Sequence, residues 1–392
     1  MIRWLRLVVV LAPLVALGVR WCSPPPAATL PLFARKYSFQ CTQCHYAFPR
    51  LNAFGMAFKQ NGYRLPGAKG ESPWESTTFP LSLLGNVGYA YTRTDAIDST
   101  GGRSTFTTST FQQNDVEFHS AGTLAPEVTF RFDNSFEGVD LPLTSGQAFV
   151  QFDDLVHDGR MNMRVGVYDA DILYLADSRR MTLTHYLSPI TLGGLGVELN
   201  GRQSGWTWAG GVINSDRTIG KPTDKSLNNF EDLYAFVTRD VVHGQLASAR
   251  VFVDQQDPRR PDKRSAQHLQ VDVNAFLNGK GWWVIPGFTY EHFADADFSQ
   301  FEKQETALLD SGLLFGPSDR WAATARYELQ HHPKFDFEGV TAFPEADLTQ
   351  LTGNVAYYVN PNAKLVLEYN RIHDNVQGPR VDQIQAYVFV GY

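Results

Sequence analysis

Cysteine is scarce in this chain of 392 residues, which has only Cys22, Cys41 and Cys44. Three cysteines are too few for a disulfide framework of the kind that stabilises small secreted domains. Basic residues are not in excess either: the chain has 34 Lys and Arg and 41 Asp and Glu, and its net charge is −7. No basic stripe is visible, so the sequence argues against nucleic acid as a partner.

Long apolar runs are also rare. The main one, residues 7–19, follows the positive residues Arg3 and Arg6 and is too short to cross a bilayer comfortably. This pattern is typical of an export signal. We predict a signal peptide over residues 1–28, with cleavage near Gly18 or near Ala28 as alternatives, and an uncleaved anchor remains a third.

Aromatic residues and glycine are abundant instead. Phe, Tyr and Trp make up 13% of the chain, and there are 32 Gly. Without long apolar runs, this composition favours an all-β protein. From about residue 80 to the end, apolar and polar residues alternate, as in a strand with two unlike faces. Three segments show this alternation clearly. The apolar residues at every second position are Met161, Met163, Val165 and Val167 in the first; Leu269, Val271, Val273, Ala275 and Leu277 in the second; and Trp321, Ala323, Ala325, Tyr327 and Leu329 in the third.

The lengths of the connections between these segments indicate whether the apolar face contacts lipid, as in a membrane barrel, or a protein core, as in a soluble sandwich. Most long connections alternate with short ones, which is typical of outer-membrane barrels and not of soluble sandwiches. The long connections are 93–109, 169–189, 214–229, 254–266 and 331–347, and the short ones are 124–127, 200–205, 278–281 and 360–363. The chain also ends on an alternating segment with a terminal aromatic, Tyr392. We predict an antiparallel outer-membrane β-barrel of about sixteen strands over residues 76–392, with lipid against its apolar face.

A compact motif precedes the barrel. Residues 41–45 read Cys-Thr-Gln-Cys-His. At this spacing two thiols can add to the vinyl groups of haem, and the adjacent histidine lies under the iron. A C-x-x-C redox pair usually needs a βαβ setting, and a zinc site needs a fourth ligand, but both remain alternatives. We predict one covalently bound haem c on Cys41, Cys44 and His45, with His45 as the proximal ligand of the iron.

A short helix is expected directly after the motif. Leu51, Phe54 and Phe58 share one helical face, while Pro49 can begin the helix and Gly62 can end it. The segment is too small for a complete cytochrome domain. We predict that residues 29–75 form a monohaem segment that sits in or under the barrel as a plug.

The sixth iron ligand is not readable from the sequence. Candidates come from the short helix, from the polar faces of two strands and from the loop 169–189, which we take as the third long loop of the barrel, the one that folds inward in many porins. They are Met56, His119, His268, Met181 and His185. Each also has an ordinary structural explanation, and water or an open position remains an alternative. Acidic residues recur in the long loops, but the sequence does not define an iron-binding site there.

Residues 33–67 resemble the fused monohaem cytochrome–porin family of iron-oxidising bacteria. The resemblance rests on the C-x-x-C-H motif and on the following FPRLNAFGMAFKQNGY, with an export signal before them and a barrel after them. It implies an outer-membrane cytochrome that takes electrons from extracellular Fe(II). It further implies a periplasmic cytochrome or another soluble carrier as the acceptor.

Three functional hypotheses follow. The first is this Fe(II)-oxidising conduit, an electron-transfer oxidoreductase, which could also serve another extracellular donor. The second is a diffusive porin whose haem is structural or sensory. The third is a haem enzyme with an open iron position. Reduction of the haem by Fe(II), ion conductance and ligand access to the iron distinguish them.

Overall fold

The computed structural model describes residues 32–391 with internal gaps, so the predicted signal peptide lies outside the described residues. The gaps are 66–67, 69, 72–79, 98–101, 113–114, 138–142, 158, 171–174, 176–178, 189–191, 215–231, 243, 256–266, 294–301, 338, 361 and 376–377. No helix within the described ranges has the length and apolar character needed to cross a membrane.

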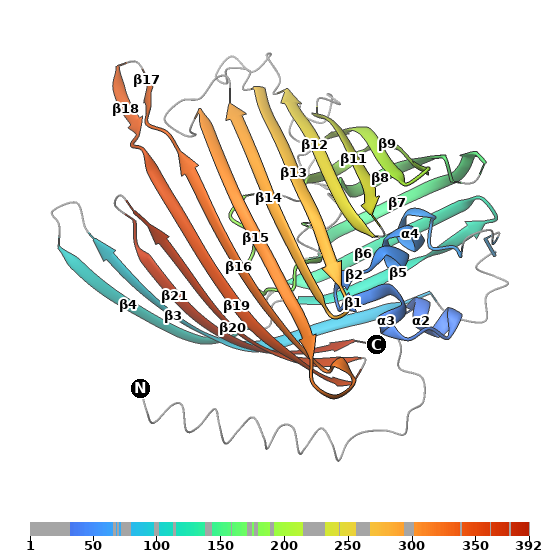
Figure 1. Ribbon diagram of the computed structural model, residues 1–392, viewed down its shortest axis with the longest axis horizontal. Coiled ribbons are helices and arrows are strands. Elements are labelled where there is room, and N and C mark those ends of the chain that lie inside the picture. Colours follow the sequence, from blue (N-terminus) through green and yellow to red (C-terminus); the bar gives the residue numbers. More distant parts are fainter. Residues whose placement is uncertain are drawn as a thin grey trace.

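The described strands close into one antiparallel barrel, in which the last strand pairs with the first (Figure 1). The strands are β3 (Ser82–Ile97), β4 (Arg103–Gln112), β5 (Asp115–Ala125), β6 (Val128–Glu137), β7 (Leu143–Val156), β8 (Met161–Ala170), β9 (Leu192–Gln203), β10 (Trp206–Asn214), β11 (Asp232–Val242), β12 (Gln245–Gln255), β13 (Gln267–Gly279), β14 (Trp282–Phe293), β15 (Lys303–Phe315), β16 (Trp321–His332), β19 (Ala346–Asn360), β20 (Ala363–Asp374) and β21 (Arg380–Gly391).

Two of these strands share one position in the barrel. β4 pairs with the second half of β3, from Gly88 to Ile97, and β5 pairs with its beginning, from Ser82 to Gly85. They therefore follow one another along the same edge of β3. Counted by position, the described strands form a sixteen-stranded barrel, which confirms the predicted fold class.

The wall has an apolar outer face and a polar inner face. On β15, Leu309 is 48% exposed while the next residue, Asp310, is fully buried. On β16, Tyr327 is exposed between the buried Arg326 and Glu328. This is the reverse of a soluble sandwich and matches a barrel whose outer face meets lipid and whose inner face lines a lumen.

One segment departs from the predicted alternation. Val165 is exposed as expected, but Val167, predicted on the same outer face, is 7% exposed. Gly166 between them has a φ of 132°, a conformation that residues with a side chain rarely adopt. After this glycine both Val167 and Tyr168 are buried, so the period of two is broken there.

In the described strands, the ends joined by the predicted short connections lie at one end of the barrel and the ends joined by the predicted long connections lie at the other. Two predicted loops are nevertheless largely strand. In the predicted loop 93–109, β3 continues to Ile97 and β4 begins at Arg103. The predicted loop 331–347 contains a small hairpin of β17 (Phe335–Phe337) and β18 (Val340–Phe343). Residues of β4 are exposed on both faces, so hydrophobicity does not alternate there. The apolar–polar pattern therefore missed these strand ends.

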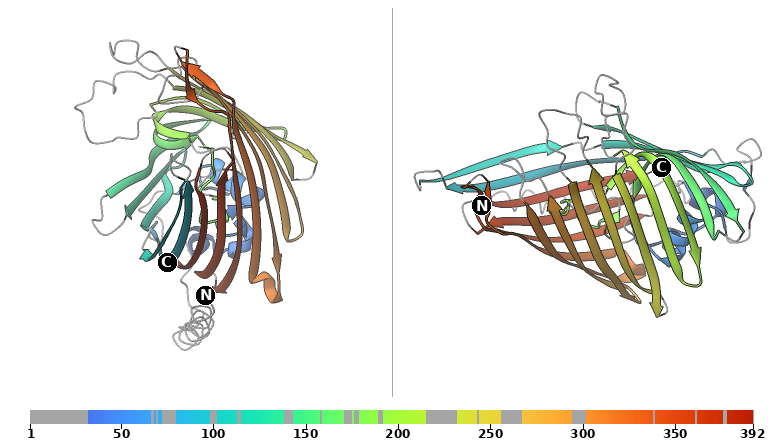
Figure 2. Two further views of the ribbon diagram at one scale, coloured as in Figure 1. Left: turned by 90° about the vertical axis from the view of Figure 1, so that its left-hand side faces the viewer. Right: turned by 90° about the horizontal axis from the view of Figure 1, so that it is seen from above.

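Residues 32–65, here called the plug, lie inside the barrel near the short connections (Figure 2). They form α2 (Leu32–Tyr37), α3 (Cys41–Cys44), a hairpin of β1 (His45–Ala47) and β2 (Arg50–Leu51), and α4 (Ala53–Gln60). The prediction that Pro49 begins the helix was wrong. Pro49 lies in the hairpin turn after a cis peptide bond, and Asn52 caps α4 instead.

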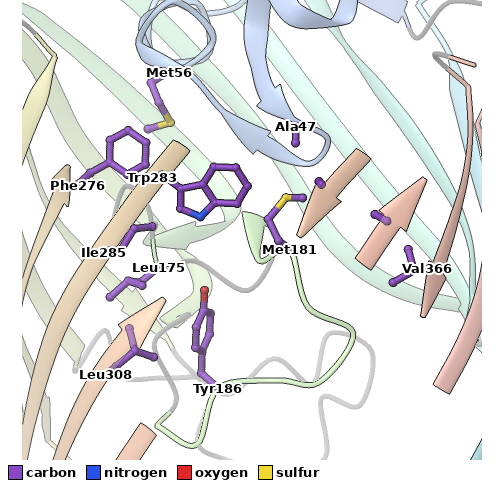
Figure 3. Close-up of a cluster of buried hydrophobic side chains, with 12 residues drawn as sticks. Ala47, Met56, Leu175, Met181, Tyr186, Phe276, Trp283, Ile285, Leu308 and Val366 are labelled. Carbon is purple, nitrogen blue, oxygen red and sulfur yellow. The ribbon is translucent and has the colours of Figure 1, made fainter. Parts of the chain in front are cut away.

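A second segment enters the lumen from the connection after β8. Its described residues, 175 and 179–188, are here called the inward loop. Leu175, Met181 and Tyr186 pack in one buried cluster with Ala47 and Met56 of the plug and with Trp283 of the wall (Figure 3). The third long loop therefore folds inward, as the sequence analysis anticipated, and meets the plug.

Candidate haem-attachment site

The C-x-x-C-H motif is placed on the plug by a helix of a single turn. Cys41 and Cys44 are the first and last residues of α3, so both thiols project from the same side. Neither cysteine forms a disulfide, both are partly buried, and burial raises the pKa of each thiol. Two adjacent thiols on one helical turn have the arrangement that a covalent haem requires.

His45 has the partner expected of an iron ligand. Its Nδ1 lies 3.2 Å from the carbonyl oxygen of Pro49, which accepts a hydrogen bond when Nδ1 carries the proton. In that tautomer Nε2 has the lone pair that can ligate a metal. Burial lowers the pKa of His45 to about 4, which keeps the imidazole neutral near neutral pH.

The wall of the barrel holds the hairpin that carries His45. The carbonyl of Phe48 accepts hydrogen bonds from the hydroxyl of Tyr358 at 3.1 Å and from Nζ of Lys364 at 3.3 Å. Both donors lie at the short-connection end of the β19–β20 pair. These bonds fix the turn whose next carbonyl, from Pro49, orients His45.

Asn52 and Gly55 join the motif to α4, and the sequence analysis did not single them out. Oδ1 of Asn52 caps α4 by accepting from the amide of Gly55 at 2.9 Å, and its Nδ2 donates to the carbonyls of Thr42 and Gln43. A Cβ on Gly55 would lie 2.1 Å from the carbonyl oxygen of Cys44. The sequence signal for Asn52 and Gly55 is the LNAFG segment, which is part of the stretch that carries the family resemblance.

A buried ion pair anchors one side of the plug. Arg50 and Asp310 are both fully buried, and Nη2 of Arg50 lies 3.0 Å from Oδ2 of Asp310. Asp310 also accepts from Nε1 of Trp283 at 3.1 Å and from the hydroxyl of Tyr186 at 3.5 Å. One wall carboxylate therefore binds the plug and the inward loop together.

The opposite side of the plug is also tied to the wall. Arg64 lies 3.0 Å from a carboxylate oxygen of Asp154 and 3.7 Å from one of Asp153. Arg131 of β6 donates to the hydroxyl of Tyr63 at 3.2 Å. These contacts fix the plug across the lumen.

The inward loop is held mainly through its backbone. Glu368 of β20 accepts from the amides of Leu183 at 2.6 Å and Thr184 at 2.7 Å. Arg326 of β16 donates to the carbonyls of Thr184 at 3.0 Å and His185 at 2.7 Å. The wall therefore supplies the charge and the loop supplies polar backbone groups.

The candidates for the sixth iron ligand lie in different places. Met56 and Met181 belong to the cluster that joins plug and inward loop, with Met56 beside Phe276 and Met181 near Ala47 (Figure 3). His185 is an exposed residue of the inward loop, 3.1 Å from a guanidinium nitrogen of Arg180.

The two strand histidines have wall partners of their own. His119 lies 2.7 Å from Glu117 and 3.0 Å from Asp133. His268 lies 3.4 Å from Glu291 and stacks on Phe293 with ring centroids 4.2 Å apart. These contacts match the structural explanation for each histidine.

A cavity of about 590 Å³ lies beside α4 at the short-connection end of the lumen. It extends between the plug and the wall of β8–β11, and neither motif cysteine nor His45 lines it. Its lining includes Lys59, Arg64, Arg202, Glu198 and Trp208. The cavity is therefore a feature separate from the haem-attachment motif.

Acidic residues of the long loops do not gather into a metal site within the described ranges. No group of three or more His, Cys, Asp or Glu side chains there could hold a metal ion. Asp347 pairs with His331 at 2.8 Å. Asp216, Asp224, Asp257, Asp295 and Asp297 lie outside the described residues.

Comparison with known proteins defines the fold. No family model and no curated protein matches the chain. An anion-selective porin from Comamonas acidovorans is 11% identical, with a TM-score of 0.52, and covers 80% of this chain and 98% of its own. The outer-membrane channel DcaP of Acinetobacter baumannii is 14% identical, with a TM-score of 0.55, and covers 80% and 97%.

OmpF of Salmonella typhi is 11% identical, with a TM-score of 0.52, and covers 79% of this chain and 97% of its own. The fold is that of an outer-membrane porin. At these identities the likeness concerns the fold alone. The plug, which carries the C-x-x-C-H motif, precedes the porin-like strands.

Proposed function

We propose that this protein is an outer-membrane cytochrome that moves electrons from extracellular Fe(II) to a soluble periplasmic acceptor. One haem c on Cys41, Cys44 and His45 is the redox centre of this proposal. The observation that carries it is the position of the motif, on a plug fixed inside a porin-type barrel. The Pro49 carbonyl beside Nδ1 of His45 supports the assignment of His45 as the iron ligand.

The position of the plug suits electron transfer across the membrane. An outer-membrane barrel has an apolar band about 25 Å tall, which an external donor and a periplasmic acceptor cannot bridge by direct contact. When bound, the haem would supply a one-electron redox centre on the plug. Arg50, Arg64 and the Phe48 carbonyl hold its attachment segment in place.

The two products of the proposed reaction form on opposite sides of the membrane, Fe(III) outside the cell and the reduced acceptor in the periplasm. Each Fe(II) ion oxidised to Fe(III) outside releases one electron, which the periplasmic acceptor takes up. Because short turns of outer-membrane barrels face the periplasm, the plug lies on the acceptor side. Oxidised iron is poorly soluble near neutral pH, so oxidation outside avoids mineral inside the cell.

The decisive experiment mixes purified, oxidised protein with Fe(II) and follows the haem absorption bands. We expect one haem per chain and reduction by Fe(II). A haem that an artificial reductant reduces, but Fe(II) does not at any pH tested, would contradict the iron assignment. It would leave another extracellular donor or the second candidate below.

A matched control is His45→Ala. We expect loss of the normal haem spectrum, because the iron loses its proximal ligand, with unchanged β circular dichroism, because His45 makes no contact between barrel strands. A normal spectrum in His45→Ala would refute the ligand assignment.

The second candidate is a diffusive porin whose haem is structural or sensory. The comparisons favour it over the first, because two of the named neighbours are described as an anion-selective porin and an outer-membrane channel. The cavity of about 590 Å³ beside α4 also provides room for a small solute within the lumen. Conductance in a planar bilayer separates the two: a steady open channel supports diffusion, and a closed one supports the conduit.

A further inference from the structure

A lysine of the barrel wall lies beside the hairpin that carries His45. Lys364, on β20, is 8% exposed, and its Nζ donates to the carbonyl of Phe48 at 3.3 Å. The centroid of the Phe48 ring lies 5.4 Å from that of the His45 ring. A single residue therefore connects this lysine to the proposed iron ligand.

Burial disfavours the ammonium form of Lys364, and two kinds of contact act against this cost. Nζ lies 4.5 Å from the centroid of the Phe389 ring and 5.4 Å from that of the Phe48 ring, both within the range of cation–π attraction. The Phe48 carbonyl accepts one of the three N–H bonds that the ammonium can donate. Each of these contacts stabilises the charged form.

No carboxylate neutralises this charge within the described part of the chain. No Asp or Glu oxygen described there lies within 4.0 Å of Nζ. Lys364 interacts electrostatically with Arg180 of the inward loop, another cation, and with the imidazole of His45. A buried charge without a counter-ion acts over a longer distance than a paired one, because neither water nor an opposite charge cancels its field.

We propose that Lys364 raises the reduction potential of the haem iron ligated by His45. The iron gains one electron and loses one positive charge on reduction, so a nearby positive charge favours the reduced state. Lys364 is thus a positioning and tuning residue of the wall, and it touches neither donor nor acceptor. This inference rests on the haem attachment proposed above.

The test is a redox titration of purified protein with chemical mediators, followed in the haem absorption bands. Lys364→Met removes both the charge and the hydrogen bond, while Lys364→Gln keeps an N–H donor without the charge. We expect the oxidised-to-reduced ratio at fixed potential to rise by roughly tenfold, the order of magnitude for one unit charge acting through a medium of ε about 20. For one electron this corresponds to about 59 mV towards lower potential.

Two controls separate charge from structure. Lys364→Arg keeps the charge and should leave the potential near that of the unaltered protein. Tyr358→Phe removes the other donor to the Phe48 carbonyl without a change of charge and should shift the ratio much less. Equal shifts in Tyr358→Phe and Lys364→Met, or no shift in Lys364→Gln, would overturn the proposal.

Haem content, measured on denatured protein, keeps this test distinct from the function itself. Absence of haem from the unaltered protein would overturn the attachment and the inference together. If haem is present but its reduction potential does not change with the charge at position 364, only the inference is overturned. The titration uses no Fe(II), so its result does not depend on the identity of the donor.

Discussion

The plug and the inward loop both fill the lumen, but they bind the wall through different parts of the chain. The plug uses charged side chains of its own, Arg50 and Arg64, which pair with wall carboxylates. The inward loop offers mostly backbone groups, which the wall residues Glu368 and Arg326 bind. The position of the plug therefore depends on its own sequence, whereas that of the loop depends largely on the sequence of the wall.

The two segments meet at one carboxylate. Asp310 binds Arg50 of the plug and accepts a bond from Tyr186 of the inward loop. The apolar cluster around Trp283 and Met181 covers the same junction. The two segments share this junction but have further wall contacts of their own, so the difference between them is best tested by changes to the contacts of one segment.

The largest expected effect comes from Arg50→Met. It leaves the fully buried Asp310 without its cation, and breaking a buried pair on one side costs about 3–5 kcal/mol. We expect the plug to dissociate from β15 and the protein to conduct ions more readily. Single-channel conductance and proteolysis within residues 32–65 measure this.

A second substitution checks the cause. In Arg50→Met with Asp310→Asn, no unpaired charge remains, and we expect closure of the channel to be partly restored. If Arg50→Met alone conducts and resists protease like the unaltered protein, the ion pair does not hold the plug.

A smaller effect is expected for Glu368→Gln, which addresses the loop alone. The amide retains one acceptor oxygen but loses the charge that strengthens the bonds from Leu183 and Thr184. Hydrogen bonds to a charged group contribute about 1.5–3 kcal/mol, so we expect a loss of about 2 kcal/mol in docking. Hydrogen exchange at the two amides should accelerate more than tenfold.

The matched control is Asp382→Asn, which removes a wall carboxylate bonded to Arg371 and Arg380 of the wall itself. It should leave exchange in the inward loop unchanged, and haem content should be normal in both variants. Acceleration of exchange in the plug as well would show that the two segments do not dock separately.

The barrel could be predicted from the sequence because lipid imposes a regular pattern. Wherever a strand crosses the apolar band, its outer residues must be apolar, as Leu309 and Tyr327 are. In β4 both faces are exposed and most residues are polar, so the alternation is absent and the sequence predicts a loop over most of this strand. The break at Gly166 also has no signature in the alternation, since glycine is common throughout the chain.

The residues of the candidate site also fall into those that could be predicted from the sequence and those that could not. Cys41, Cys44 and His45 were found because covalent chemistry requires fixed spacing. Asp310, Glu368 and Lys364 were not, because each contacts the plug or the inward loop from a strand far along the chain. On those strands their polarity only marks them as facing the lumen. Partners so distant in sequence leave no local pattern.

The smallest expected effect concerns the local fold of the plug. Asn52→Ala removes the cap of α4 and the two bonds to the carbonyls of Thr42 and Gln43. Loss of a cap typically costs about 1 kcal/mol, and Arg50 and Arg64 still fix the segment. We therefore expect a closed channel and attached haem, with α3 less firmly held. Faster hydrogen exchange at the amide of Gly55 would show this, while conductance as large as in Arg50→Met would mean that this bond, and not the buried ion pair, governs the plug.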